Sequence, residues 1–297
     1  MAKKTSYLFC RYQILVDESP LSASEELSLL VSVLGRPIAY RVREPDPDDF
    51  DTYLMKPRSK SMHGYSVHTW EVAQDIKFRE RSRYDRTNDD VQNEIVPTDE
   101  IRHTKFVAVP LLRVVAVDDS LSERSLGARS AVGRFRGILE SHRDDIDVTV
   151  SFAGTPQDAQ RALETWSLDQ FSFTVRPFNP TPRKPGDVMD ELMQNDGVGI
   201  LRAIAKPAGE QDMRDSHAGL IAEARGLTDA GYGQYGATGT TPDGLRASIS
   251  QPKFSTEKKK NLETAAQNRT LKVYIERSDT AEEEESAVVK ALIDLYG

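Results

Sequence analysis

Residues 106–176 carry the feature that most constrains the fold, a hydrophobic pattern whose period switches repeatedly between two and about 3.6 residues. Residues 106–117 form an apolar run that only Pro110 and Arg113 interrupt, as in a buried strand. The pattern predicts strand, helix, strand, helix and strand in turn over residues 106–117, 128–141, 146–152, 155–166 and 171–175. This order predicts an α+β fold, with mixed or antiparallel sheets and flanking helices.

Other segments extend the same fold. Ser22 and Glu25 have the spacing of a capping box, which predicts a helix that begins after Ser22 and ends near Gly35. Residues 77–98 are strongly charged with few apolar side chains, so we expect a long loop there. Further strands are predicted at 7–16, 65–76, 220–227, 232–238, 245–250 and 271–275, and further helices at 187–193, from Ser255 or Thr256, and at 282–295.

Length and linker composition predict two domains. A chain of 297 residues is longer than one domain of ordinary size, and residues 118–127 have the composition of a linker. We expect an N-terminal α+β domain over residues 1–117, which residues 253–297 complete. A central and mobile α+β domain is expected over residues 118–252.

Composition excludes several classes of protein. Cys10 is the only cysteine, which excludes an internal disulfide and a cysteine-rich metal or iron–sulfur centre. No apolar run approaches the length of about eighteen residues that crosses a membrane, and the first residues lack the hydrophobic region of a secretory signal. We therefore expect a soluble, cytoplasmic protein that does not insert into a membrane.

Three glycines resemble a cofactor motif. Gly231, Gly233 and Gly236 have the spacing of a dinucleotide-binding loop, but such a loop needs a helix directly after it. Residues 237–242 instead have the sequence of a hairpin, so we interpret the glycines as sheet or turn residues and expect no cofactor. The five histidines show no metal-ligand spacing, and no metal site is predicted.

One motif leaves an enzymatic alternative open. Asp243 follows Pro242, and Glu257 and Lys259 come later with the spacing of the PD-(D/E)xK metal-dependent nucleases. In such a site the two carboxylates hold Mg²⁺ and the lysine orients water or phosphate. The residues around Glu257 have the sequence of a solvated first helical turn rather than a core strand. A nuclease is therefore the second hypothesis, and we predict a non-enzymatic protein without catalytic residues.

Positive charge is concentrated locally, although 39 Lys and Arg against 47 Asp and Glu give a formal charge of −8. Residues 77–86, 120–143 and 253–277 are basic, and residues 278–297 are acidic. Arginines on a sheet beside a lysine-rich helix start can hold successive phosphates without reading bases. The predicted DNA-binding residues are Arg225, Arg246, Lys253, Lys258, Lys259 and Lys260.

Two alternatives involve no nucleic acid. The basic segments have the composition of a solvated face on an ordinary acidic protein. A protein-interaction module is the other alternative, with the acidic helix at 279–295 as its docking face.

The order of elements from residue 106 onward resembles the RexA family of phage-exclusion proteins of lambdoid prophages and related phage and bacterial proteins. The resemblance rests on the strand at 106–113, the strand–helix–strand at 146–175, the strand at 219–227 and the glycine-rich hairpin that follows. It covers the C-terminal two thirds of the chain as a pattern of elements rather than a diagnostic motif. The N-terminal third departs from it, with an acidic loop at 44–51.

This resemblance implies a non-enzymatic, two-domain homodimer that binds double-stranded DNA without sequence preference and reorients its domains on binding. The fold would be similar to that of the recombination-associated protein RdgC. Such a protein acts in superinfection exclusion in the cytoplasm of a bacterial host, and we expect a membrane protein as a further partner. Residues 118–127 and 251–255 are the candidate hinges.

Overall fold

A computed structural model confirms the α+β fold. It describes residues 4–35, 38–40, 50–85, 90–120, 122, 124–152, 156–177, 188–209, 211–230, 232–250, 270–276 and 280–297. For residues 4, 38–40, 50, 76–85, 90–99, 156 and 276 it describes the backbone alone.

The chain divides into two compact units. Unit 1 comprises Met1–Arg11, Val114–Ala116 and Ser151–Gly297, and unit 2 comprises Tyr12–Arg113 and Val117–Val150. This division differs from the expected one, which placed a single boundary between residues 117 and 118. The two units instead share the first strand, because β1 contributes residues to both of them. Strand pairing between distant segments therefore defines the units, rather than the order of segments along the chain.

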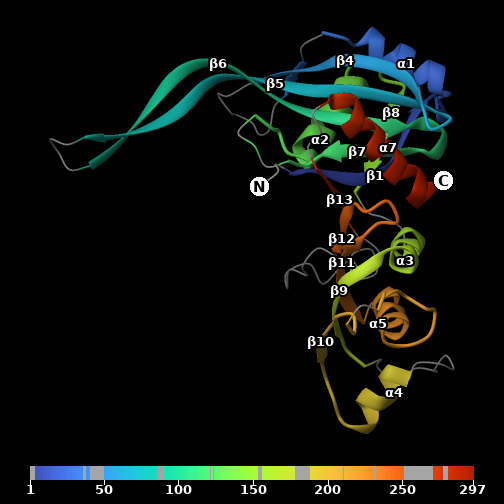
Figure 1. The fold of residues 1–297 in the computed structure, drawn as a ribbon. Coiled ribbons are helices and arrows are strands. Elements are labelled where there is room, and N and C mark those ends of the chain that lie inside the picture. The colour runs from blue at the N-terminus through green and yellow to red at the C-terminus, as the bar shows by residue number, and fades with distance from the viewer. Residues whose placement is uncertain are drawn as a thin grey trace. The chain divides into compact units, whose positions relative to one another are not determined.

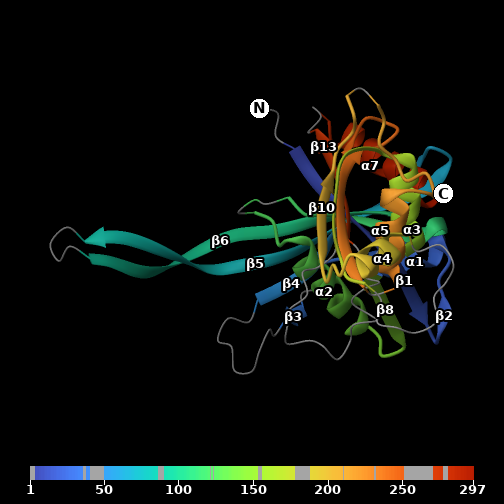
Figure 2. The ribbon, with the colours of Figure 1, turned by 90° about the horizontal axis from the view of Figure 1, so that it is seen from below.

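Unit 1 is built on an antiparallel sheet with helices on one side. The strands follow the order β10-β9-β11-β12-β13-β1. Figures 1 and 2 show α3, α4 and α5 on one side of β9, β10 and β11. The elements are β1 (Lys4–Val16), α3 (Pro156–Thr165), β9 (Ser167–Val175), α4 (Val188–Asn195), β10 (Leu201–Ala205), α5 (Leu220–Asp229), β11 (Gly233–Thr240), β12 (Arg246–Ser250), β13 (Thr270–Glu276) and α7 (Ala281–Tyr296).

Unit 2 contains a second antiparallel arrangement in the order β6-β5-β4-β3. Trp70 lies at the centre of its core, where the indole stacks on Phe106 and Phe135 with centroid distances of 5.2 and 5.1 Å. The elements are β2 (Ser19–Pro20), α1 (Ala23–Ser32), β3 (Ile38–Tyr40), β4 (Phe50–Met62), β5 (Tyr65–Asp85), β6 (Asp90–Val109), the 3₁₀ helix η1 (Pro110–Leu112), β7 (Val114–Asp118), α2 (Ala128–Glu140) and β8 (Ile146–Ser151). Strands β7 and β8 each contribute residues to both units.

Strong local signals predict many of these elements correctly. The Ser22 hydroxyl accepts a hydrogen bond from the Glu25 backbone N–H, and the Glu25 carboxylate accepts one from Ser22, so the capping box at α1 is confirmed. The terminal helix buries the predicted apolar stripe, which consists of Val288, Val289, Leu292 and Leu295. Strands β11 and β12 form the predicted hairpin.

The prediction of a strand at 220–227 is wrong, because these residues begin helix α5. Ile221, Ala224 and Leu227 are buried at a spacing of three residues, and Thr228 extends the same stripe. That spacing is helical, and alanine, glutamate and arginine between the buried positions are good helix formers. One of the segments on which the resemblance rests is therefore helical rather than extended.

The prediction of a long loop at 77–98 is also wrong. Strands β5 and β6 pair from Phe78 with Pro97 to Asp85 with Asp90, and Figure 1 shows them as a two-stranded ribbon. Strand pairing joins backbone groups, which a charged sequence supplies as readily as an apolar one. A count of charges therefore could not exclude strands here.

The apolar run at 106–117 is two strands rather than one. Pro110 starts the short η1 helix, and Arg113 ends it in the left-handed region with φ 53°. Strands β4 and β10 have no counterpart in the prediction. The expected helix from Ser255 or Thr256 and the candidate hinge at 251–255 lie outside the described residues.

Candidate functional site

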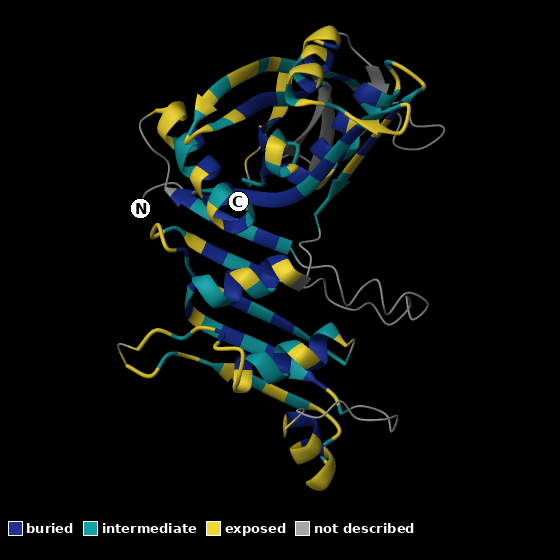
Figure 3. Cartoon of the chain, turned by 90° about the vertical axis from the view of Figure 1, so that its right-hand side faces the viewer, coloured by how far each residue is buried: buried dark blue, intermediate teal, exposed yellow. Residues whose placement is uncertain are grey.

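The strands of unit 1 have one apolar and one polar face. Phe171, Phe173 and Val175 of β9 are buried, and the intervening Ser172 and Thr174 are partly exposed. Because successive side chains of a strand point to opposite faces, Ser172 and Thr174 lie on the face opposite the three buried residues. Figure 3 shows this alternation of buried and more exposed residues.

The pairing register shows which residues of other strands share the polar face. Thr174 pairs with Arg202 of β10 and with Gln234 of β11, so these three side chains form one row across the sheet. The register places Ile204, Ser172, Gly236 and Ser250 in a second row, Thr238, Ser248 and Lys272 in a third, and Thr240, Arg246 and Tyr274 in a fourth. We call these four rows the polar face.

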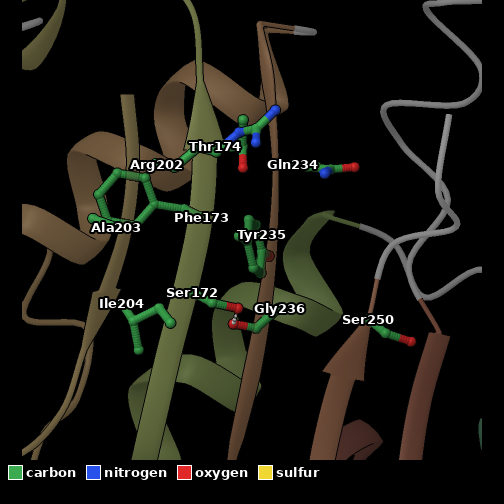
Figure 4. A pocket seen from close by; sticks show the side chains of 10 residues that line it. All are labelled: Ser172, Phe173, Thr174, Arg202, Ala203, Ile204, Gln234, Tyr235, Gly236 and Ser250. Carbon is green, nitrogen blue, oxygen red and sulfur yellow. Dashed lines mark hydrogen bonds between the residues drawn. The ribbon is translucent and has the colours of Figure 1, made fainter. Parts of the chain in front are cut away.

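Part of the polar face is hollowed into a groove of about 630 Å³. Figure 4 shows Arg202, Thr174 and Gln234 at one end of the groove, with Ser250 on a neighbouring strand. The Ser172 hydroxyl donates a hydrogen bond to the Gly236 carbonyl at 3.3 Å, which joins β9 to β11 in the floor. Hydroxyl, amide and guanidinium groups thus share the lining of one open hollow with apolar and aromatic residues, among them the exposed Ile204.

Cations outnumber carboxylates on this face. Arg202, Arg246 and Lys272 are its cationic side chains among the described residues, and Asp169 is the carboxylate beside it. The Arg246 Nη2 atom lies 3.2 Å from Asp169 Oδ2, with both side chains about half exposed or more. The Lys272 ammonium lies 5.5 Å from the centroid of the Tyr274 ring. The arrangement is suited to binding anions through several hydrogen-bond donors.

Arg225 does not belong to this site, contrary to the prediction. It lies on α5, and its Nε atom donates a hydrogen bond to the buried Asp215 carboxylate at 2.8 Å. Its Nη1 atom donates to Gln160 at 3.1 Å, so the guanidinium ties α5 to α3 and to the segment before α5. This arginine therefore stabilises the packing of α5 within unit 1, and the same guanidinium cannot also bind phosphate.

Arg246 is the one predicted residue that the structure places on the polar face. Lys253, Lys258, Lys259 and Lys260 lie outside the described residues. Arg202 is absent from the predicted residues because strand β10 was not predicted. Lys272 is also absent from them, although the alternation of Leu271, Val273 and Ile275 around it indicates which face of the strand it occupies.

The interpretation of the glycines as sheet residues holds where the structure describes them. Gly233 and Gly236 lie within β11, and the turn to β12 follows rather than a helix. A Cβ atom on Gly233 would lie 2.7 Å from the Thr174 carbonyl oxygen, so close strand packing requires glycine there.

The nuclease motif is only partly described. Asp243 lies in the turn between β11 and β12, where the Gly244 N–H donates to the Thr241 carbonyl at 2.9 Å, and Asp243 forms an ion pair with Lys290 of α7. Glu257 and Lys259 lie outside the described residues. Within the described part of the chain, no group of three or more metal-ligating side chains is found.

The acidic helix at 279–295 corresponds to α7. Its apolar stripe is buried in unit 1, and Glu284 accepts a hydrogen bond from the Tyr7 hydroxyl at 2.7 Å. Glu282 and Glu283 remain exposed in the first turn. Any protein that docks on α7 would therefore meet acidic rather than apolar side chains.

Unit 2 contains a separate cluster of titratable groups. His103 Nδ1 lies 3.1 Å from a Glu71 carboxylate oxygen, and Lys56 Nζ lies 3.1 Å from the same carboxylate. The hydrogen bond from His103 lowers the pKa of Glu71 to about 2, with Lys56 contributing in the same direction. The same hydrogen bond raises the pKa of His103. This cluster stabilises the charged forms of Glu71 and His103. It belongs to unit 2, whereas the polar face belongs to unit 1.

No protein-family model matches this chain, and no curated protein is significantly similar to it. None of the helices in the described residues is long and apolar enough to cross a membrane.

Proposed function

We propose that this protein binds double-stranded DNA without sequence preference and without catalysing a reaction, through the polar face of unit 1. The observation that carries the proposal is the placement of Arg202, Arg246 and Lys272 on one open sheet face beside hydroxyl and amide groups. Phosphate oxygens accept hydrogen bonds from all three kinds of group. Such contacts fix the position of a duplex but carry no base information.

The spread of the cations fits a duplex. Four strand spacings separate β10, which carries Arg202, from β13, which carries Lys272, and this corresponds to about 19 Å. That exceeds the ~12 Å width of the major groove. Cations at the two ends of the face can therefore reach phosphates on both sides of one groove.

The composition of the face favours backbone contacts over base stacking. Tyr274 is its aromatic residue among the described rows, and Lys272 lies over that ring. Proteins that bind single strands usually present several rings on which successive bases stack. Serine, threonine and glutamine instead dominate here, and these side chains hydrogen-bond phosphate and sugar.

The basic segment at 77–86 is a second candidate for contact with the same ligand. It carries Arg79, Arg81 and Arg83, and its backbone pairs with β6 as a two-stranded ribbon. The major groove accommodates a ribbon of this kind. We therefore expect charge reversal at these three positions to weaken DNA binding independently of the polar face.

The proposal is tested by titrating a labelled random-sequence duplex with the protein at about 50 mM and about 200 mM salt, with and without Mg²⁺. Three phosphate contacts predict a slope near −2.7 in a plot of log affinity against log salt. The double variant Arg202→Glu/Lys272→Glu should bind more weakly at low salt and with a flatter slope. Arg136→Glu, which reverses an exposed charge on α2 of unit 2, is the matched control.

Each outcome decides between specific alternatives. Equal affinity in the double variant and the wild type would remove the polar face as the site. Absence of binding at low salt would favour the protein-interaction alternative. Cleavage of the duplex in Mg²⁺ would favour the nuclease alternative.

The cellular role that we propose is superinfection exclusion by a homodimer in the cytoplasm of a bacterial host, with a membrane protein as partner. The resemblance to the RexA family supports it. Expression of the protein in a bacterial host should lower the plating efficiency of unrelated phages, and light scattering should give twice the mass of one chain. Normal plating of every phage tested would overturn the exclusion role.

A further inference from the structure

Unit 1 has a second hollow, which is apolar and lies away from the polar face. It measures about 470 Å³ and is lined by residues of α4, of the segment between α4 and β10, and of the start of α5. Met189 and Met193 of α4 are buried in its floor. We call this hollow the α4–α5 groove. Its volume is within the range of grooves that bind ligands or peptide side chains.

The aliphatic side chains that form the walls of the α4–α5 groove are unusually exposed to solvent. Val188 and Leu192 are each 58% exposed, and Leu220 is 49% exposed. Val188 and Leu192 are four residues apart, so they lie on the same side of α4. Scattered surface leucines are common, but aliphatic side chains gathered around one hollow mark an interaction site.

Carboxylates flank the apolar surface. Asp196 and Glu223 belong to the lining, and the exposed Glu191 lies on α4 directly before Leu192. The described lining contains no lysine, arginine or histidine. The groove therefore presents an apolar floor within a negative rim.

The charge of the rim selects among possible occupants. A second copy docked by two-fold symmetry would place the same patch against itself, which brings the acidic rims of the two copies together. Like charges at close range disfavour this contact. A segment with apolar anchors and flanking lysines or arginines would instead gain binding free energy from apolar contacts with the floor and from ion pairs with the rim.

We propose that the α4–α5 groove binds a basic amphipathic helix of a partner protein. Its apolar residues, spaced i, i+3, i+4 and i+7, enter the hollow between Val188, Leu192 and Leu220. Its basic residues pair with Asp196 and Glu223. The two methionines of the floor allow the groove to adapt to different apolar side chains. This proposal is independent of DNA binding.

The probe is a synthetic helical peptide of about fourteen residues, which is about four turns, with leucines at the four anchor positions and lysines elsewhere. A second peptide carries glutamates in place of the lysines, and a third has the first composition in scrambled order. Binding of each labelled peptide to the full chain is measured by fluorescence anisotropy at physiological salt. The basic amphipathic peptide should bind at least about tenfold more tightly than either control.

Variants of the chain locate the site. Leu192→Asp should lower affinity for the basic peptide by about tenfold or more. Leu111→Asp, at another aliphatic side chain that is 78% exposed, should leave it unchanged. Asp196→Lys should weaken binding of the basic peptide and strengthen binding of the glutamate peptide.

Circular dichroism verifies that each variant is folded, and DNA binding by Leu192→Asp should equal that of the wild type. Equal binding of the basic peptide to wild type and to folded Leu192→Asp would overturn the proposal. A wild-type dimer that Leu192→Asp dissociates would assign the groove to a second copy and would overturn it as well.

Discussion

The Arg225 guanidinium donates a hydrogen bond from Nε to the Asp215 carboxylate at 2.8 Å, and the Asp215 side chain is fully buried. The second carboxylate oxygen accepts the His217 backbone N–H at 3.0 Å, and the Asp215 N–H donates to the Leu163 carbonyl at 3.0 Å. The ion pair thus fastens α5 to the segment before it, and the backbone hydrogen bond of Asp215 fastens that segment to α3. Replacing one residue of such a pair destabilises the fold, because the charge of the other residue stays buried without its partner.

Replacing Arg225 should therefore damage the fold rather than the DNA-binding surface. We expect Arg225→Met to lower the free energy of unfolding by about 3–5 kcal/mol. Urea denaturation followed by circular dichroism measures the loss, and Arg214→Met, at an exposed arginine, is the control. A stable Arg225→Met protein with weakened DNA binding would return Arg225 to the candidate site.

The lysines at 258, 259 and 260 provide a test that needs no description of their structure. Converting all three to glutamate removes three cations from the predicted DNA-binding segment that follows β12. We expect weaker binding to a random duplex at low salt and a flatter dependence on salt, because fewer counterions are released. Unchanged affinity would confine the site to the polar face.

Asp243 distinguishes the binding protein from the nuclease. We expect the duplex to stay intact in Mg²⁺ during overnight incubation with the wild-type protein, as judged by gel electrophoresis. The carboxylate is already engaged by Lys290, which favours a structural role for this turn. Mg²⁺-dependent cleavage that Asp243→Ala abolishes would instead establish the nuclease.

Two glycine substitutions should act in opposite directions. Gly233→Ala would place a Cβ atom 2.7 Å from the Thr174 carbonyl oxygen, and we expect a loss of about 1–3 kcal/mol in the free energy of unfolding. Gly226 lies within α5, and a Cβ atom there would meet no atom within 4 Å. Gly226→Ala should stabilise the protein by about 0.5–1 kcal/mol. Equal urea midpoints for the two variants would contradict the close approach of β9 and β11.

The Glu71–His103 pair predicts a dependence of stability on pH. The pKa of His103 is raised from its ordinary value of 6.5, so its contribution is complete below that pH and is lost as the pH rises through the raised value. The pKa of Glu71 is lowered from 4.5 to about 2, so its contribution is present above 4.5 and is lost as the pH falls towards 2. The pair therefore contributes most between these two ordinary values.

His103→Gln tests the upper limit of this range. The wild-type protein should lose part of its free energy of unfolding as the pH rises above 6.5, through the raised pKa of His103, and the variant should lose less. NMR titration of the imidazole should give a midpoint above 6.5. A midpoint below that value would show that desolvation of the imidazole outweighs the hydrogen bond that His103 donates to Glu71.

Local sequence determined the elements that carry their own signals. The capping box fixed the start of α1 because Ser22 and Glu25 satisfy each other's backbone groups within one turn. The apolar stripe of α7 and the Pro-Asp-Gly turn between β11 and β12 were equally local. Alternation identified β8, β9 and β13 because each buries one face, whereas β1 buries both faces over residues 6–10 and alternates only beyond Cys10.

Tertiary structure decided what depends on distant partners. Strand β10 was not predictable because its exposed Arg202 and Ile204 give little apolar alternation, and it is a strand through its pairing with β9. The ribbon of β5 and β6 likewise depends on register rather than on composition. The sequence predicted Arg225 and Arg246 in one site, but the fold pairs the first with the buried Asp215 and leaves the second on an open sheet face. Charge is a property of the residue, whereas its availability to a ligand is set by the neighbours that the fold brings to it.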